Sequence, residues 1–157
     1  MPIHVRPADG ADLAAINAVI EAAVMGWDLP ERVKRLSLPS YRYDSVDLAH
    51  LAAVVAEAEG RVVGVATWEP ADPRDVPAGR AALLLHGLYV GPAWQRQGVG
   101  RRLLAAVREA ASRDGQAGVL VKAQADARGF FEANGFVALD PEDPDRHYAH
   151  RYWLDLG

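Results

Sequence analysis

The sequence predicts one α/β domain in which helices cover both faces of a mixed, mostly antiparallel central sheet. Strand and helix patterns alternate in its second half, which is typical of α/β layers. Its 157 residues correspond to one domain, at roughly 100–200 residues per domain. Half of the residues are hydrophobic and 24% are charged, an ordinary globular balance, and no segment repeats. We therefore expect residues 1–157 to form a single domain.

A strand and two helices are predicted at the N-terminus. Ile3 to Arg6 alternates apolar and polar residues, as a strand does. Asp9 then caps a helix that ends at Gly26. Pro30 to Leu36 predicts a second short helix, and Ser37 to Asp44 predicts a loop. The apolar face of the first helix holds Leu13, Ile16, Ile20, Ala23 and Val24.

Three strands are predicted next. Ala52 to Glu57 and Arg61 to Trp68 are rich in valine, and Glu59-Gly60 between them indicates a hairpin turn. A proline-rich stretch at 70–77 cannot continue a central strand and predicts a connecting loop. Ala81 to Val90 is apolar again and predicts the third strand.

The second half predicts two helices and three strands, of which a short one follows Gly135 at Phe136-Val137. Val99 to Ala111 has one apolar face and is a helix, and Val119 to Val121 is a short buried strand. Asp126 to Asn134 is a second helix, capped by Asp126 and ended by Gly135. An acidic loop, Asp140 to Asp145, precedes a last strand over roughly Tyr148 to Leu156.

Composition excludes several function classes. The chain has no cysteine, which excludes a thiol nucleophile, a disulfide scaffold and a cysteine-ligated metal. Its net charge of −4 argues against general nucleic-acid binding. No apolar run approaches the ~20 residues of a membrane span, and the first residues do not resemble a signal peptide. We expect a cytoplasmic protein without a nucleic-acid or membrane partner.

No metal site is expected either. The histidines show no ligand spacing, and His147 and His150 are expected on opposite faces of the last strand.

The most informative stretch runs from Leu88 to Leu104, as a strand, a glycine-bearing loop and a helix start. Gly98 and Gly100 allow a ligand to approach the main chain. The amides of residues 97–101 point outward at the helix N-terminus, which binds phosphate well. Three arginines at this one place in an acidic chain favour an anionic ligand: Arg96, Arg101 and Arg102.

Three phosphate-binding loops are compatible with a glycine-rich helix start. A Walker A loop requires Gly-Lys-Ser/Thr, which is absent. A dinucleotide loop requires a third glycine, where this chain has Leu103. The third is a Gln/Arg-x-x-Gly-x-Gly/Ala loop that receives the pyrophosphate of coenzyme A, and residues 95–100, Gln-Arg-Gln-Gly-Val-Gly, fit it.

Here the sequence resembles the GCN5-related N-acetyltransferase (GNAT) family. The likeness covers nearly the whole chain and is most specific over 88–104, with support from Ala127, Phe130-Phe131 and Gly135-Phe136. It implies the GNAT acyl-CoA N-acyltransferase fold and direct transfer of acetyl from acetyl-CoA, the cosubstrate, to a primary amine in a ternary complex. The acceptor is a small-molecule or peptide amine that the sequence does not specify. Dimerisation is common among relatives, so a homodimer is compatible with the resemblance.

The resemblance also implies cofactor-binding residues. The main chain of 88–90 would hydrogen-bond the pantetheine arm, and an amide there would polarise the thioester carbonyl, where a fixed donor is most effective. Pyrophosphate would lie on the amides of 97–101. The residues implied are Leu88, Tyr89, Val90, Gln95, Arg96, Gln97, Gly98, Val99, Gly100, Arg101, Gln124 and Phe131.

The chain departs from the family pattern at two of these positions. Phe131 stands where many members have a tyrosine that protonates the CoA thiolate, and Gln124 stands where an asparagine is frequent. Solvent or Tyr148 could supply that proton instead. A noncatalytic CoA-sensing or interaction module is therefore an alternative to an enzyme.

His86 is the first choice for the base that deprotonates the amine, and Glu69 is the second. Alternation places His86 on the same face as Leu88, and histidine suits a base near neutral pH. A hydrogen-bonded histidine within the sheet and a solvated strand end are the structural alternatives. Four aromatic residues either line an acceptor pocket or pack in the core: Trp27, Tyr41, Tyr43 and Trp68.

Overall fold

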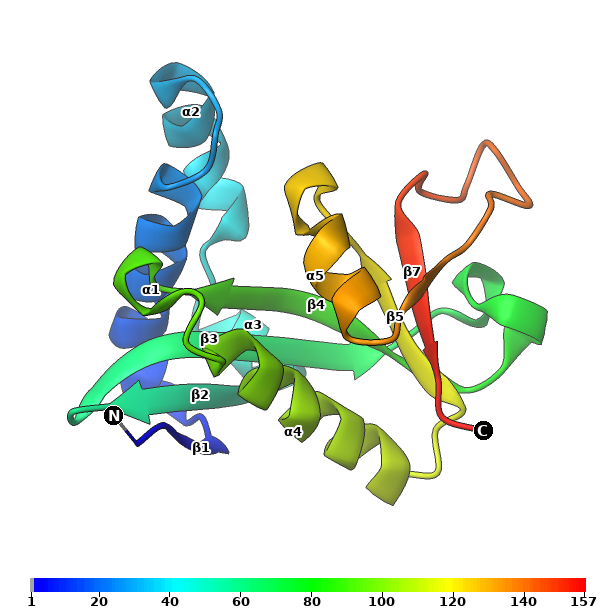
Figure 1. The fold of residues 1–157 in the computed structure, drawn as a ribbon, viewed down its shortest axis with the longest axis horizontal. Coiled ribbons are helices and arrows are strands. Elements are labelled where there is room, and N and C mark those ends of the chain that lie inside the picture. Colours follow the sequence, from blue (N-terminus) through cyan, green and yellow to red (C-terminus); the bar gives the residue numbers. More distant parts are fainter. Residues whose placement is uncertain (1) are drawn as a thin grey trace. The chain divides into compact units, whose positions relative to one another are not determined.

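A computed structural model describes residues 2–157, whose strands form one seven-stranded sheet in the order β1-β2-β3-β4-β5-β7-β6 (Figure 1). The strands are β1 His4–Pro7, β2 Ala52–Ala58, β3 Arg61–Pro70, β4 Ala82–Val90, β5 Gly118–Lys122, β6 Val137–Ala138 and β7 Arg151–Asp155. β1 pairs with β2, and β7 with β5 and β6, in antiparallel fashion, whereas β4 and β5 are parallel. The predicted mixed, mostly antiparallel sheet is confirmed.

The helices are α1 Leu13–Met25, α2 Glu31–Tyr41, α3 Ser45–His50, α4 Val99–Arg113 and α5 Arg128–Ala133. Short 3-10 turns, η1 to η5, lie at Gly10–Asp12, Pro73–Asp75, Pro77–Gly79, Pro92–Trp94 and Ala125–Ala127. The chain divides into two compact units. The first contains Met1–Thr67 and Gly87–Ala106, and the second contains Trp68–His86 and Val107–Gly157.

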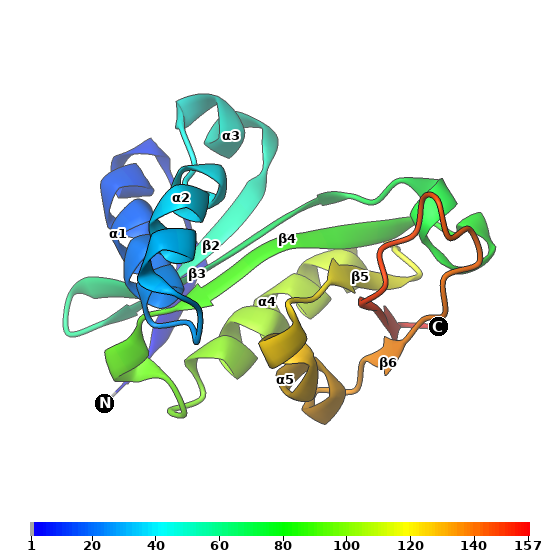
Figure 2. The ribbon, with the colours of Figure 1, turned by 90° about the horizontal axis from the view of Figure 1, so that it is seen from above.

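Helices cover both faces of the sheet within the first unit. Ile16, Ile20 and Val24 of α1 are fully buried and form one core cluster with Val55 of β2 and Val65 of β3. Neighbouring strand residues face opposite sides, so Gly64 faces away from this cluster. The start of α4 packs on that other side of β3, against Gly64. In Figure 2, α1 and α2 run side by side in the blue region of the chain.

The β2–β3 hairpin forms as predicted. Glu59 and Gly60 both have positive φ, 54° and 75°, which gives the tight turn that matches the twist of two antiparallel strands. The pairing of β1 with β2 places His4 opposite Glu57 and Pro7 opposite Val54.

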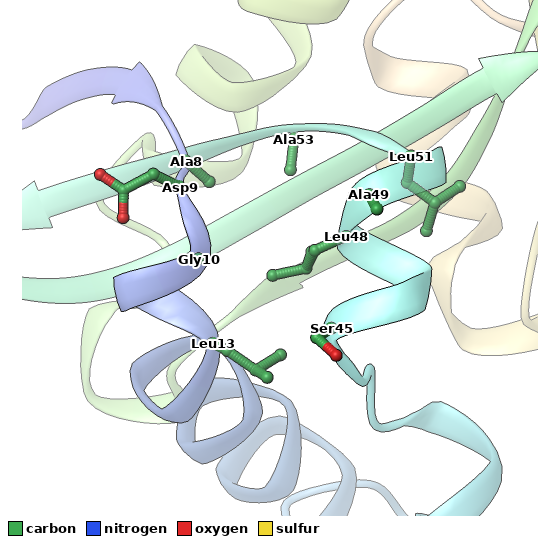
Figure 3. A pocket seen from close by; sticks show the side chains of 9 residues that line it. All are labelled: Ala8, Asp9, Gly10, Leu13, Ser45, Leu48, Ala49, Leu51 and Ala53. Atoms are coloured by element: carbon green, nitrogen blue, oxygen red, sulfur yellow. The ribbon is translucent and has the colours of Figure 1, made fainter.

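A small cavity lies next to α3 in the first unit. The cavity has a volume of about 260 Å³ and lies between η1, the start of α1, α3 and β2 (Figure 3). Leu13 and Leu48 point into it, whereas the carboxylate of Asp9 points away, toward the amides that it caps.

β5 is the centre of the second unit. It pairs with β4 from Ala82–Gly118 to Leu85–Val121 and with β7 on its other side. A β-carbon at Gly118 would collide with Leu154 and Trp153, so only glycine allows Trp153 to fold over this strand. Trp153 packs there with Val76, Ala82 and Leu120.

The predicted end of the second helix and the start of the following loop were wrong. α2 does not end at Leu36 but continues through Pro39 to Tyr41, so residues 37–41 of the predicted loop are helical. α3, after Asp44, was not predicted. α2 is held by tertiary contacts: Leu38 is buried in the core, and Lys34, a residue only 6% exposed, donates from its ammonium to the carbonyls of Met25 and Trp27. These contacts outweigh the hydrogen bond that a helical proline removes.

Two predictions about the second unit were also wrong. Asp126 caps neither η5 nor α5, because it lies inside η5 and the N-cap positions belong to Gln124 and Ala127. β7 begins only at Arg151, so His147 and His150 are not strand neighbours. The polar segment before β7 is held by side-chain contacts instead.

Arg6 on β1 links three elements of the first unit. Its guanidinium donates to the two carboxylate oxygens of Asp12 at 2.9 and 2.8 Å and also pairs with Glu57 of β2. Asp12 in turn accepts from the Asp9 amide, which completes a capping box at the entry to α1. The hydrogen bonds from Arg6 lower the pKa of Asp12 to about 2.

Asp12→Asn is expected to lower the free energy of unfolding at pH 7 by about 1–3 kcal/mol, because Arg6 loses a charged partner. The folded-state pKa lies below the usual 3.8, so this contribution is complete above pH 4 and is lost as the pH falls toward 2. Urea unfolding at pH 7 and pH 3 should show the difference between the two proteins narrowing. Asp47→Asn alters a capping box on α3 that has no arginine partner and should cost about 1 kcal/mol or less. An equal difference at both pH values would contradict this assignment.

Candidate functional site

The start of α4 presents backbone amides that no helical carbonyl can accept. The Arg102 amide donates to the Gly98 carbonyl at 3.1 Å, so the helical ladder begins there. The amides of Val99, Gly100 and Arg101 come before this first bond of the helix, so no carbonyl of a preceding helical turn can accept from them. Together with the helix dipole, they make this end electropositive.

The loop before α4 is built to expose these amides. Gly98 has φ 82° and Arg96 has φ 63°, a left-handed conformation that is unusual for a residue with a β-carbon. Two glutamine side chains fasten the loop to the preceding backbone. Gln95 Nε2 donates to the Val90 carbonyl at 3.3 Å, and Gln97 Nε2 donates to the Ala93 carbonyl at 3.1 Å.

Three arginines surround this helix start. Arg96, Arg101 and Arg102 are all exposed. Within residues 2–157 the structure shows no carboxylate paired with any of them, whereas Arg6, Arg74 and Arg146 are all in ion pairs. The three guanidinium groups are therefore available to an anion from solution.

Gly64 of β3 sets how closely α4 approaches the sheet. A β-carbon there would lie 2.9 Å from Cδ1 of Leu103, 3.0 Å from Cγ1 of Val99 and 3.2 Å from the Tyr89 carbonyl oxygen. Val99 and Leu103 are almost completely buried at this contact. The buried face of the first turn thus fixes its other face, with the free amides, toward solvent.

The pairing of β4 with β3 is irregular somewhere between Ala82 and Gly91. The Ala71 amide donates to the Ala82 carbonyl, and the Gly91 amide donates to the Val63 carbonyl. Between these bonds the chain advances nine positions on β4, from 82 to 91, but only eight on β3, from 63 to 71. One extra residue in one strand of an antiparallel pair is a β-bulge.

The end of β4 therefore offers a backbone edge. Because Gly91 donates toward β3, alternation turns the polar groups of Tyr89 toward β3 and those of Leu88 and Val90 away from it. The hydrogen bond from Gln95 to the Val90 carbonyl agrees with this direction. The paired stretch with β5 ends at Leu85, and β4 continues to Val90.

The two residues predicted as alternative bases lie together in the second unit. His86 Nε2 and Glu69 Oε2 are 3.9 Å apart, and their side chains are 44% and 39% exposed. Protonated His86 would thus form an ion pair with Glu69. The structure combines two candidates that the sequence offered as alternatives.

Tyrosines gather over Gly87 in the first unit. Tyr43 is buried, and its hydroxyl is 2.7 Å from the Thr67 hydroxyl. A β-carbon at Gly87 would lie 2.5 Å from the Tyr43 hydroxyl and 2.8 Å from Cε2 of Tyr89. Burial, with the Tyr43 and Tyr41 hydroxyls nearby, raises the pKa of Tyr89 above its usual range, so its phenol stays protonated.

The remaining predicted residues have varied surroundings. Trp68, like Tyr43, is buried, whereas Trp27 and Tyr41 are half-buried and form an edge-to-face pair with ring centroids 5.2 Å apart. Phe131 is 5% exposed and packs edge-on against Phe130 and Phe136.

Two predicted polar side chains lie at the surface of the second unit. Gln124 is exposed at the start of η5. Tyr148 is 44% exposed and packs against the His150 ring.

Within residues 2–157, no group of three or more histidine, aspartate or glutamate side chains could hold a metal ion. None of the helices in this range combines the length and the apolar character that a membrane crossing requires.

Comparison with known proteins identifies the family. The model of the acetyltransferase (GNAT) domain matches residues 40–150, well over half of the chain. The chain belongs to the GNAT acetyltransferase family. No curated protein matches it.

Solved structures share the GNAT fold over nearly the whole chain. A GCN5-related N-acetyltransferase from Rhodopseudomonas palustris has 22% identity and a TM-score of 0.75, covering 99% of this chain and 97% of its own. The PaiA N-acetyltransferase from Thermoplasma acidophilum, solved with coenzyme A, has 16% identity, a TM-score of 0.74 and 99% coverage of both chains. A GNAT family acetyltransferase from Brucella melitensis, solved with acetyl-CoA, has 22% identity and a TM-score of 0.68, covering 99% of this chain and 89% of its own. The predicted fold is confirmed.

Sequence reasoning missed two features of this GNAT site. The β-bulge in β4 leaves no residue signature, because an extra residue in a strand shows only in its pairing with β3. The glycines at 64 and 87 did carry a signal, since glycine inside a strand indicates a close approach. Their partners, the first turn of α4 and the tyrosine cluster, are distant in sequence.

Gly64→Ala is expected to lower the free energy of unfolding by about 1–3 kcal/mol, because the new methyl group overpacks the contact with Val99 and Leu103. Gly10→Ala is the matched control, since a β-carbon there meets nothing within 4 Å. Denaturant unfolding compares the two variants. Equal stability of the two would show that α4 can move away from β3 without cost.

Proposed function

We propose that this GNAT protein transfers acetyl from acetyl-CoA to a primary amine, supplied by a small molecule or a peptide. The observation that carries the proposal is the start of α4, where free amides and three unpaired arginines follow directly on the open end of β4. Phosphate groups favour such a helix end. The solved relatives with coenzyme A or acetyl-CoA support the same ligand.

The chain supplies backbone donors at both ends of this ligand. Amides of 97–101, with Arg96 and Arg101, would hold the pyrophosphate. The edge of β4 at Leu88 and Val90 would pair with the amide groups of the pantetheine arm. One of these two amides would donate to the thioester oxygen, where negative charge develops as the carbonyl is attacked.

The His86–Glu69 pair is suited to remove the proton of the acceptor amine. An ammonium group has no lone pair and must lose a proton before it can attack a carbonyl carbon. Imidazole accepts a proton near neutral pH, and the carboxylate 3.9 Å away favours the resulting imidazolium. His86 is thus the base and Glu69 its electrostatic partner.

The leaving thiolate needs a proton from another group. Phe131 has no proton to give and is buried among aromatic rings. Tyr148 is exposed and is the proposed donor, with solvent as the alternative. A thiol with a pKa near ~8.5 is a tolerable leaving group, so the Phe131 substitution need not abolish activity.

Two measurements test the proposal. Isothermal titration should detect binding of both acetyl-CoA and CoA, and the absence of both would exclude any CoA function. Release of free CoA is then measured against a panel of amino acids, polyamines and peptides with free N-termini. Release that depends on an added amine supports the enzyme, whereas binding without release from any amine supports a noncatalytic CoA-sensing module.

Arg101→Gln is expected to weaken acetyl-CoA binding about 5- to 20-fold, because a charge-assisted contact with the pyrophosphate is lost. Arg113→Gln, at the opposite end of the same helix, is the control and should leave the affinity unchanged. Titration at two salt concentrations adds a second check, since the affinity of the parent protein should fall more steeply with salt than that of Arg101→Gln. Equal losses for both variants would show that α4 does not bind the ligand at its start.

His86→Gln is expected to lower kcat about 100-fold or more and to remove the acidic limb of the pH–rate profile, without changing the Kd for acetyl-CoA. Glu69→Gln should lower kcat by a smaller factor and shift that limb to lower pH, because the imidazolium loses its partner carboxylate. Steady-state rates between pH 5.5 and 9 check both outcomes. An unchanged rate and limb in His86→Gln would exclude His86 as the base.

A further inference from the structure

The segment between β6 and β7 is tied to η2 by three basic side chains. Arg146 pairs with Asp72 and Asp75, each at 3.0 Å. Arg151, 3% exposed, donates to the backbone carbonyls of Asp75 at 2.6 Å and Asp140 at 2.9 Å. His147 makes the third tie and is the one whose charge can change near neutral pH.

The contacts of His147 require one protonation state. Its Nδ1 lies 3.1 Å from the backbone amides of both Glu142 and Asp143, and both amides donate to it. An atom that accepts two N–H groups carries no proton, so the ring proton is on Nε2. Nε2 lies 2.8 Å from the Arg74 carbonyl oxygen and donates to it. The neutral Nε2–H tautomer satisfies all three contacts at once.

We propose that His147 is a positioning residue that holds the 140–150 segment, with Tyr148, against η2 only while its imidazole is neutral. A proton on Nδ1 would face two amide N–H groups and would break both hydrogen bonds. The segment would then keep its contacts through Arg146 and Arg151 but lose those of His147, the residue next to Tyr148. Acid thus releases this segment locally while the sheet stays folded.

The charges around His147 do not offset this loss. They are Asp140, Glu142, Asp143, Asp145 and Arg146 in its own segment, Asp72 at the N-cap of η2, Arg74 and Asp75 in η2, Lys122 on β5 and Arg151 on β7. The η2 carboxylates already face cations, namely Arg74, Arg146 and Lys122. Contact with Arg74 keeps the pKa of Asp72 below its usual range, so Asp72 stays charged between pH 8 and pH 5. The carboxylates of the segment would attract an imidazolium, but they cannot restore the acceptor that the two amides need.

Nuclear magnetic resonance on the full chain tests the state of His147 directly. Imidazole nitrogen shifts at pH 7.5 should show the Nε2–H tautomer. Amide exchange, divided by the intrinsic rate at each pH, should show protection of Glu142 and Asp143 that falls about tenfold or more between pH 7.5 and pH 5, in step with His147 titration. An Nδ1–H tautomer, or protection that is independent of pH, would overturn the proposal.

Two variants distinguish a pH-dependent role of His147 in holding the 140–150 segment from a general effect on stability. His147→Gln remains neutral at every pH, so the pH dependence of protection at 142 and 143 should disappear. His150→Gln is the matched control, because His150 contacts Tyr148 but neither amide, and it should keep the parent pH dependence. If both variants retain that dependence, His147 is not the responsible group.

The positioning of Tyr148 by His147 rests on the proposed function, and it is tested by measuring kcat. If Tyr148 protonates the thiolate, His147→Ala and Tyr148→Phe should lower kcat by similar factors, and the double variant should be no slower than the slower single variant. Multiplying effects would refute positioning through Tyr148. The resonance measurements do not require turnover. An inactive protein would therefore refute the proposed acetyltransferase activity, whereas the role of His147 would still be tested by its tautomer and by the amide protection.

Discussion

The first turn of α4 approaches β3 so closely that a β-carbon at residue 64 would overpack the contact, and the arrangement of the glycine loop before α4 depends on this contact. Val99 and Leu103 fill the space above Gly64, which fixes both the height and the rotation of the helix start. With one face of the turn buried, the amides of 99–101 and the Arg101 side chain occupy the other. A single absent methyl group thus orients the proposed binding surface, which a different element contributes.

Local irregularities matter in the same way in β4, which begins in the second compact unit and ends in the first. The bulge changes which residues face β3, so that Leu88 and Val90 turn outward at the end of the strand. Gly87, in the same stretch, leaves space for the Tyr43 hydroxyl and the Tyr89 ring. The backbone edge and the tyrosine cluster therefore both depend on departures from a regular strand in β4.

How much the sequence could predict depends on how local the cause was. The β2–β3 hairpin, α4 and the glycine loop follow from nearby residues, and the structure reproduces their predicted positions within a few residues. The end of α2 depends instead on Leu38 and Lys34 reaching distant partners, which outweigh Pro39. Similarly, the link between His86 and Glu69 depends on the pairing of β3 with β4 and not on sequence spacing. Tertiary contacts, absent from any short window of sequence, decide these cases.

The net charge of the chain did not reveal the arginine cluster at the start of α4, because several carboxylates are neutralised by ion pairs within the chain. Asp12 and Glu57 hold Arg6, and Asp72 and Asp75 hold Arg74, Arg146 and Lys122. These pairs cancel much of the charge that the composition reports, and they fasten loops and strand ends to each other. Among residues 2–157, the three arginines at the start of α4 take part in no such pair, and Arg96 even adopts a backbone conformation that glycine would adopt more easily. Keeping an arginine at a strained position is understandable if its charge has a ligand, which links the local backbone strain to the binding of an anion.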